Sequence, residues 1–259
     1  MNANSPGICI SCFAFLFRAS YKVDGSNFSR CNQPERKHVM AEQAQFELYA
    51  FWRSSAAFRV RVALNLKGLS AHEQNINLDA GEQRSDEFLK ISPLGSIPAL
   101  VQEGHEPLTQ SLAILEFLDE LQPSPPLLPS DVYARARVRS IASMCAADTH
   151  PMVVPRVKKY LQTTGGFDDA AWRAWQIKWL STGLTAIEER LAGSSETGVY
   201  CHGDQPTMAD ICLASIVAIT RVFKITVPDI PTIDRIMSVC DQHPAFMKAD
   251  PKKQTGAPT

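Results

Sequence analysis

Ser54 and Ser55 are adjacent hydroxyl side chains at the point where an extended segment gives way to a helical pattern. One interpretation is a helix cap, because a serine oxygen accepts hydrogen bonds from the free amides of a first turn. The same helix start also presents unsatisfied N–H groups and the positive end of the helix dipole, which suit an anion. A thiolate bound there would gain a hydroxyl donor and a favourable field, and both lower the pKa of a thiol. The pair is therefore a candidate for thiolate chemistry.

The Ile97–Pro98 step is a second candidate, and it precedes a short apolar segment. Cis peptide bonds occur almost only before proline, and tight turns use them. A cis turn at Pro98 would direct the main-chain N–H and C=O of Ile97 outward, where they can pair with an extended peptide. The alternative is an edge-strand proline without a role in binding.

Ser111 begins another helical pattern, with Gln110 directly before it. An N-cap is again the simple interpretation. A hydroxyl and main-chain amides at a helix start also suit a carboxylate. The Gln110 amide offers two donors and an acceptor, so it can anchor more of the same ligand. Each of these signals is weak when it is taken alone.

The elements that must position these residues follow from the hydrophobic pattern of the first half. A helix begins at Ser54 and stops at Gly68, and we expect Arg59 and Arg61 to lie on its solvated surface. The predicted elements are, in order, a strand over 46–51, this helix, a strand over 71–78, a short helix within 81–91, a hairpin over 98–109 and a helix from 111. This β-α-β-α-β-β-α order predicts a thioredoxin-like layer of helices on a mixed sheet.

The second half shows no strand pattern after its proline-rich start. Helical patterns run over 131–148 and 168–192, and the latter carries a tryptophan stripe that is typical of a core seam. Thr207 and Asp210 have the spacing of a capping box, so we assign Asp210 to structure and not to catalysis. The expected organisation is a disordered extension over 1–44, a thioredoxin-like domain over 45–121, a linker over 122–130, an all-α domain over 131–249 and a tail over 250–259.

Composition excludes several function classes. The formal net charge is −1 and the pI is about 6.6, which does not favour a nucleic-acid partner. No segment approaches the roughly 20 apolar residues of a membrane span. The seven cysteines are scattered and odd in number, which favours a reducing, cytoplasmic compartment over a disulfide framework. Cys9 and Cys12 form a C-x-x-C pair, but they lack the strand and helix that a redox site needs.

The leading segment over 1–39 has few acids and a short apolar run that precedes its positive charges. A secretory signal has the opposite order, so this interpretation is disfavoured. We interpret the segment as an extension without a fold, with Met40 as a natural start. A mitochondrial presequence is the alternative.

Four motifs, taken in their order and context, resemble a known family. They are Arg-Ser-Ser-x-x-x-Arg-Val-Arg at 53–61, Gly-Ser-Ile-Pro-Ala-Leu at 95–100, Gln-Ser-Leu-Ala-Ile at 110–114 and Thr-Met-Ala-Asp at 207–210. Together they resemble the zeta class of glutathione transferases, over about Phe46 to Pro258. The resemblance implies an α+β N-terminal thioredoxin-like domain followed by an all-α C-terminal domain. It also implies glutathione as the cofactor, a homodimer, and no metal.

The implied reaction is the cis–trans isomerisation of maleylacetoacetate to fumarylacetoacetate, a step of tyrosine and phenylalanine catabolism. The glutathione thiolate would add to the activated double bond of a dicarboxylic enone, the new single bond would rotate, and elimination would return the trans alkene. The nearest alternative is a maleylpyruvate isomerase. A conjugating glutathione transferase or an α-haloacid dehalogenase comes next, and a non-catalytic interaction module is the remote alternative.

The resemblance also implies roles for single residues. Ser54 would be the catalytic residue at the thiolate, with Ser55 beside it. Arg156 or Arg221 would clamp a substrate carboxylate with forked donors. The implied glutathione contacts are Ser54, Ser55, Gln83, Ile97, Pro98, Gln110, Ser111 and His150.

Within this set, different parts of the tripeptide have different contacts. The main chain of Ile97 would pair with the cysteinyl unit. Gln110 and Ser111 would take the γ-glutamyl end. His150 would line the cleft from the second domain.

Four positions depart from the pattern of the family. Ala56 stands where many members have a cysteine, and chemistry on the bound thiol does not need that cysteine. Val153 and Val154 stand where an Asn-Asn pair is common, and Val222 stands where a second arginine is common. These valines touch the expected substrate pocket, so they weaken the substrate assignment more than the glutathione assignment.

Overall fold

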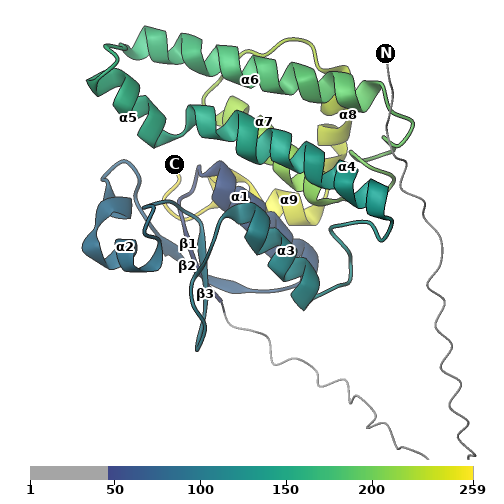
Figure 1. The fold of residues 1–259 in the computed structure, drawn as a ribbon, viewed down its shortest axis with the longest axis horizontal. Helices are drawn as coiled ribbons and strands as arrows, with labels where there is room; N and C mark the ends of the chain where they lie inside the picture. Colours follow the sequence, from purple (N-terminus) through teal and green to yellow (C-terminus); the bar gives the residue numbers. More distant parts are fainter. Residues whose placement is uncertain (1–45, 259) are drawn as a thin grey trace, which may run out of the picture. The chain divides into compact units, whose positions relative to one another are not determined.

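The computed structural model describes residues 46–258, and its first half contains one mixed sheet (Figure 1). The strands are β1 (Phe46–Ala50), β2 (Ala71–Asn75), β3 (Ala99–Gln102) and β4 (Leu108–Thr109). Their order in the sheet is β2-β1-β3-β4. β1 pairs in parallel with β2 and antiparallel with β3, and β3 pairs antiparallel with β4. The predicted strands and hairpin are therefore present, although β2 is shorter than predicted.

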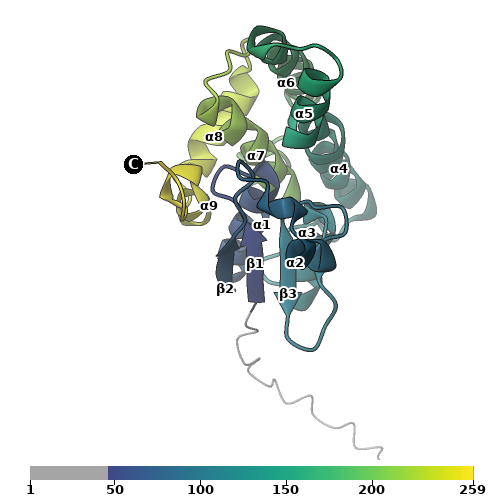
Figure 2. The ribbon, with the colours of Figure 1, turned by 90° about the vertical axis from the view of Figure 1, so that its left-hand side faces the viewer.

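Helices cover both faces of this sheet. They are α1 (Ser55–Lys67), α2 (Asp86–Ile91) and α3 (Ser111–Leu121). Successive side chains of β1 point to opposite faces. Phe46 meets Phe117 of α3 at 6.2 Å between ring centroids, whereas Tyr49 lies 5.9 Å from Phe88 of α2. Figure 1 shows α2 on one side of the strands and α1 with α3 on the other, and Figure 2 looks onto the sheet from the α2 side.

The described chain after α3 contains helices and no strand. The helices are α4 (Val132–Ser143), α5 (Pro155–Thr163), α6 (Asp169–Ala192), α7 (Met208–Val222), α8 (Pro231–Cys240) and α9 (Pro244–Ala249). The helical pattern predicted over 131–148 is confirmed, although only its first part is an α-helix. After α4 the chain forms a π-helical segment, Met144–Thr149, and then a 3-10 turn, His150–Val153. Pro151 lacks an N–H donor, so an α-helix cannot continue undisturbed through this point.

α1 is covered by neighbours on most of its surface. It begins at its N-cap Ser54 and ends at Gly68, whose φ of 67° suits glycine, as predicted. It packs against α3, α7 and α9. As a result Arg59 and Arg61 are only 2% and 5% exposed. The expectation that these arginines lie on a solvated surface is wrong, because neighbours from both halves cover α1, and both side chains pair with groups of the first half.

The predicted capping box at the start of α7 is confirmed. Thr207 Oγ1 accepts a hydrogen bond from Ala209 N at 3.3 Å, and the Asp210 carboxylate accepts one from Thr207 N at 2.8 Å. The same carboxylate accepts from Cys201 N at 2.7 Å. Burial raises the pKa of Asp210, against the lowering effect of these hydrogen bonds. The geometry agrees with the assignment of Asp210 to structure.

The segment between α3 and α4 is anchored to the first half. The buried Lys67 Nζ donates to Asp119 Oδ1 at 2.6 Å and also to the carbonyl oxygen of Pro125. The same Asp119 oxygen accepts from Leu127 N at 2.7 Å. Residues 46–258 fall within a single compact unit, so the predicted boundaries around 122–130 stay a prediction.

The residues after α9 return to the first half. They form a 3-10 turn, Pro251–Lys253, in which Pro251 is buried. Gly256 lies beside Trp52, since a Cβ on this glycine would be 4.0 Å from Trp52 Cδ1. The expected tail over 250–259 is therefore packed against the loop after β1 as far as the structure describes it.

Two expectations concern the rest of the chain. The predicted extension over 1–44, with Cys9, Cys12 and Met40, lies outside the described residues. Within the described part, no helix has both the length and the apolar composition that crossing a membrane requires.

Candidate functional site

Three segments that carry predicted site residues meet at one edge of the sheet. Tyr49 near the end of β1 pairs with Ala99 at the start of β3, and Ala99 also pairs with Thr109 at the end of β4. The residues that follow β1, precede β3 and follow β4 therefore lie next to one another. These segments carry Ser54, Ile97, Pro98, Gln110 and Ser111.

Ser54 is the N-cap of α1 and is half-buried. Its Oγ accepts a hydrogen bond from Ala57 N at 3.2 Å. Within residues 46–258 its own O–H proton donates to no acceptor. Ser54 thus serves the helix as an acceptor and keeps one donor for a ligand.

Ser55 has a different environment, although it is the next residue. It is buried, and its Oγ donates to the carbonyl oxygen of Ser215 in α7 at 2.7 Å. This bond fastens α1 to the second half and uses the hydroxyl proton. The structure therefore separates the two serines that the sequence pattern groups together.

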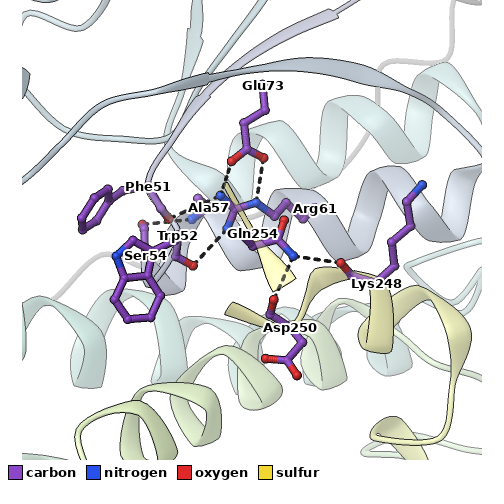
Figure 3. Close-up of polar contacts among 9 residues, drawn as sticks. All are labelled: Phe51, Trp52, Ser54, Ala57, Arg61, Glu73, Lys248, Asp250 and Gln254. Atoms are coloured by element: carbon purple, nitrogen blue, oxygen red, sulfur yellow. Dashed lines mark hydrogen bonds and ion pairs between the residues drawn. The ribbon is translucent and has the colours of Figure 1, made fainter. Parts of the chain in front are cut away.

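Arg61 fixes the main chain of the loop before Ser54 (Figure 3). Its guanidinium forms two hydrogen bonds with the Glu73 carboxylate of β2, at 2.9 and 2.5 Å. It also donates to the carbonyl oxygens of Phe51 at 3.3 Å and Trp52 at 3.5 Å. A paired, charged donor in this position limits the freedom of the loop that presents Ser54.

Arg53 braces the same loop from its outer side. It forms a forked ion pair with Asp79, with oxygen distances of 2.7 and 2.5 Å. Its guanidinium carbon also lies 5.6 Å from the ring centroid of Trp52 and 5.8 Å from that of Phe223, which follows α7. Arg53 belongs to the motif around Ser54, but nothing in the sequence pattern indicated these partners.

The turn before β3 packs against Gln83. The Ile97–Pro98 peptide bond is cis, as predicted. Gly95 has a φ of 60°, and a Cβ on it would lie 2.7 Å from the carbonyl oxygen of Gln83. Glycine is required there for both reasons. Gln83 Oε1 is buried and has no hydrogen-bond partner in the described chain, so an acceptor remains available beside this turn.

The start of α3 lacks a side-chain cap. Gln110 has a φ of 67° and a ψ of 107°, and its side chain forms no capping hydrogen bond. Such a backbone conformation costs a non-glycine residue on the order of 1–3 kcal/mol. Ser111 is buried, and its Oγ accepts a hydrogen bond from Arg59 Nη1 at 2.9 Å. The first amides of α3 therefore stay available to a ligand.

His150 follows the π-helical segment and is half-buried. Burial lowers the pKa of its imidazole well below 6.5, and the charges of Arg59 and Arg156 lower it further. The ring is therefore neutral at neutral pH and carries one donor and one acceptor. Gly183 of α6 permits this placement, because a Cβ on it would lie 2.2 Å from Thr149 Oγ1.

The two arginines expected to clamp a substrate carboxylate have different surroundings. Arg156 of α5 is exposed, and its Nη1 lies 3.5 Å from Ser96 Oγ in the turn before β3. Arg221 at the end of α7 is already paired with Asp241 at 2.8 Å. Arg156 therefore lies beside the turn that contains Ile97, whereas Arg221 lines a pocket formed mainly by α7, α9 and the residues after α9.

The polar groups at this edge fit one kind of ligand. They comprise a free hydroxyl proton at Ser54, a buried acceptor on Gln83, the main chain of Ile97 before the paired residues of β3, and an open helix start at Ser111. A tripeptide with a thiol, main-chain amides and a carboxylate matches this set. We did not expect Arg59 to take part, although its position one turn after Ser55 was a visible signal.

Comparison with known proteins gives the same relatives by sequence and by structure. Residues 44–120 match the family described as glutathione S-transferase, N-terminal domain. A maleylpyruvate isomerase from Ralstonia sp. is 39% identical over 80% of this chain and 98% of its own length. The solved structure of a maleylacetoacetate isomerase from Methylobacterium extorquens AM1, with bound malonate and glutathione, is 44% identical, with a TM-score of 0.81 over 82% of this chain and 100% of that one. A holo maleylpyruvate isomerase described as a zeta-class bacterial glutathione S-transferase is 38% identical, with a TM-score of 0.79 over 82% of this chain and 100% of that one.

Proposed function

The chain belongs to the zeta class of the glutathione S-transferase family, and from this premise we propose that it is a glutathione-dependent isomerase that converts maleylacetoacetate to fumarylacetoacetate. The observation that carries the proposal is the convergence of Ser54, Ile97 and Ser111 at one sheet edge in a chain that spans nearly the full length of such isomerases. A relative from Pseudomonas aeruginosa that bears the name maleylacetoacetate isomerase is 36% identical over 99% of its length.

In this proposal glutathione supplies, when it is bound, a thiolate that can add reversibly to an activated double bond. Ser54 donates its free hydroxyl proton to the sulfur, and the α1 start adds the field of its amides. Both effects favour the ionised thiol at neutral pH. The Ser55 hydroxyl is engaged with Ser215, so Ser55 contributes through its main chain and through the packing of α1.

The remaining contacts hold the tripeptide. The main chain of Ile97, beside the cis Pro98, pairs with the cysteinyl unit. Gln110 and the open start of α3 take the γ-glutamyl end. The unpartnered Gln83 Oε1 offers an acceptor to the tripeptide, and the neutral His150 offers an uncharged polar edge from the second half.

Arg156 is the better candidate for the substrate carboxylate. It is exposed and points to Ser96 beside the tripeptide turn, whereas Arg221 would have to leave Asp241 first. We expect Arg156→Gln to raise the KM for a maleyl substrate and to leave the Kd for glutathione unchanged. Arg221→Gln is the matched control, with a smaller effect on this KM. An equal effect of both variants would remove the preference for Arg156.

The reaction is tested by a spectrophotometric assay of maleylacetone isomerisation with and without glutathione. We expect turnover that requires glutathione without consuming it. Maleylpyruvate is the second candidate substrate, because a maleylpyruvate isomerase is among the similar proteins and Val153, Val154 and Val222 change the family pattern. The ratio of kcat/KM for the two substrates decides between them. Glutathione consumption in place of isomerisation would favour a conjugating transferase.

We also propose that the protein is a cytoplasmic homodimer. The four cysteines of the described chain, Cys145, Cys201, Cys212 and Cys240, are free and buried, which agrees with a reducing compartment. Leu121, Val132 and Tyr133 are 44%, 66% and 86% exposed at the end of α3 and the start of α4, and large exposed apolar side chains of this kind suit a symmetric contact. Multi-angle light scattering tests this proposal, and a monomer mass at working concentration would contradict it.

A further inference from the structure

The geometry points to Arg59 as a positioning residue of the γ-glutamyl site. We propose that it orients the Ser111 hydroxyl as a donor and supplies the buried positive charge that a γ-glutamyl α-carboxylate needs. This inference rests on the proposed glutathione site, and it assigns a role to a residue that would not touch the ligand.

Arg59 links the first turns of two helices. Its Nη1 donates to Ser111 Oγ of α3 at 2.9 Å, and its Nε lies 3.4 Å from the carbonyl oxygen of Ser55 in α1. The side chain is 2% exposed. Its Nη2 is buried and has no hydrogen-bond partner in the part of the chain that the structure describes.

The charge of Arg59 has no carboxylate partner within residues 46–258. Burial lowers the pKa of its guanidinium, and the groups whose charge would counteract this lowering are the thiols of Cys212 and Cys145. Burial raises the pKa of Cys212 to about 11 and that of Cys145 well above its usual value, so both thiols are neutral at neutral pH. A guanidinium stays charged in proteins, and an unpaired buried charge is unfavourable. The free protein therefore holds a positive charge that an anion can neutralise.

The hydrogen bond between Arg59 and Ser111 has only one possible direction. A guanidinium donates and cannot accept, so Ser111 Oγ must be the acceptor. The single hydroxyl proton of Ser111 must then point elsewhere, and no described residue accepts it. Since the neighbouring Gln110 gives α3 no side-chain cap, this proton and the first α3 amides form a set of donors for a carboxylate.

Lys67 shows what a purely structural cation looks like in the same helix. It is also buried, also lies on α1 and also reaches α3. Its ammonium pairs with Asp119 at 2.6 Å and with the carbonyl oxygen of Pro125. The fold thus provides a carboxylate for Lys67 and none for Arg59, which is the pattern expected if the partner of Arg59 arrives with a ligand.

The test compares two ligands on matched variants. Glutathione is compared with 4-aminobutyryl-cysteinyl-glycine, which differs only in having hydrogen in place of the γ-glutamyl α-carboxylate. Titration calorimetry of the full chain gives the ratio of the two Kd values. We expect the wild type to prefer glutathione by about tenfold to a hundredfold, as for a hydrogen-bonded buried charge.

Arg59→Met should reduce this preference to about twofold or threefold, with KM for glutathione raised and kcat at saturation nearly unchanged. Arg59→Lys keeps the positive charge but loses the planar set of guanidinium donors, so it should show an intermediate preference for glutathione. Lys67→Met is the control, and it should lower stability while leaving the preference at the wild-type value. If Arg59→Met does not fold, Arg59→Lys decides the question.

The inference is overturned if the wild type shows no preference, or if the Arg59 variants lose affinity for both ligands equally. Turnover of maleylacetone by the wild type separates the two proposals. A preference that depends on Arg59 without turnover would overturn the proposed reaction alone. Normal turnover with a preference that Arg59 variants retain would overturn the role of Arg59 alone.

Discussion

Side chains satisfy the first amides of α7, whereas the first amides of α3 have no side-chain cap. At α7, Thr207 and Asp210 form a buried, reciprocal capping box that leaves little for a ligand to bind. At α3, Gln110 adopts a φ of 67° and offers no side-chain cap, while Ser111 is held by a cation. A closed helix start contributes to folding, whereas an open one keeps donors in place for a ligand.

The largest effect expected from this comparison is on the stability of the protein when the capping box of α7 is removed. Asp210→Ala removes the acceptor of Thr207 N and Cys201 N in a fully buried place. We expect the free energy of unfolding to fall by about 2–4 kcal/mol. Denaturant unfolding measures it, with Asp241→Ala at the exposed ion pair as a control that loses less than about 1 kcal/mol. A specific loss of glutathione affinity in the folded variant would show that this start is not purely structural.

The next effect is on turnover at Ser54. Ser54→Ala removes the hydroxyl donor, so at neutral pH we expect turnover to fall by about tenfold or more, because less of the glutathione thiol is ionised. The loss should shrink as pH rises toward the ordinary thiol pKa of about 8.5, where the thiolate forms without help. Glutathione affinity should change little. An ultraviolet titration of the bound thiolate measures its ionisation, and a pH profile of kcat measures the change in turnover.

Ser85 provides the matched control for the cap of α1. It caps α2 with the same geometry, since its Oγ accepts from Phe88 N at 3.2 Å, as Ser54 Oγ does from Ala57 N. Ser85→Ala and Ser54→Ala should therefore lose a similar stability of about 1 kcal/mol. Only Ser54→Ala should lose turnover. Full turnover in Ser54→Ala would reduce Ser54 to a helix cap and transfer the role to the backbone amides.

A smaller effect is expected at Ser111, and it should appear in the KM for glutathione and not in kcat. Ser111→Ala should raise the KM for glutathione about fivefold and change kcat by less than about twofold, because it removes binding energy that is equal in ground and transition states. Steady-state kinetics with varied glutathione measure both constants. A fall in kcat with an unchanged KM would contradict the division of labour between α1 and α3.

The smallest effect concerns the strained backbone at Gln110. Gln110→Gly and Gln110→Ala both remove the side chain, but only glycine tolerates a positive φ easily. We expect the glycine variant to be more stable than the alanine variant by about 1 kcal/mol, with equal glutathione affinities. Thermal unfolding of the two variants gives the difference. An alanine variant as stable as the glycine variant would mean that the backbone relaxes when the side chain is removed.

Local chemistry explains what the sequence could predict. The end of α1 at Gly68, the Thr207 capping box and the cis Ile97–Pro98 bond each depend on a few neighbouring residues, and all three were predictable. The order of strands and helices followed from the hydrophobic period, and with it the three loops at one sheet edge. The residue identities around Ser54 and Ser111 then indicated the ligand.

Contacts between residues that are distant in the chain explain what the sequence could not predict. Ser54 and Ser55 looked equivalent, and they differ because the partner of Ser55, Ser215, comes 160 residues later. Arg59 was placed on a solvated surface because a local pattern does not reveal how many helices cover α1. The π-helical segment before His150 likewise depends on the close approach of α6 at Gly183.

The four tryptophans lie in two separate elements of the chain. Trp172, Trp175 and Trp179 all belong to α6, whereas Trp52 stands in the loop before Ser54 with the Arg53 guanidinium carbon 5.6 Å from its ring centroid. Replacing the three indoles of α6 by phenylalanine would leave Trp52, at the sheet edge, as the single tryptophan. Its emission would then report the arrival of a ligand next to Ser54 in real time, without an attached dye.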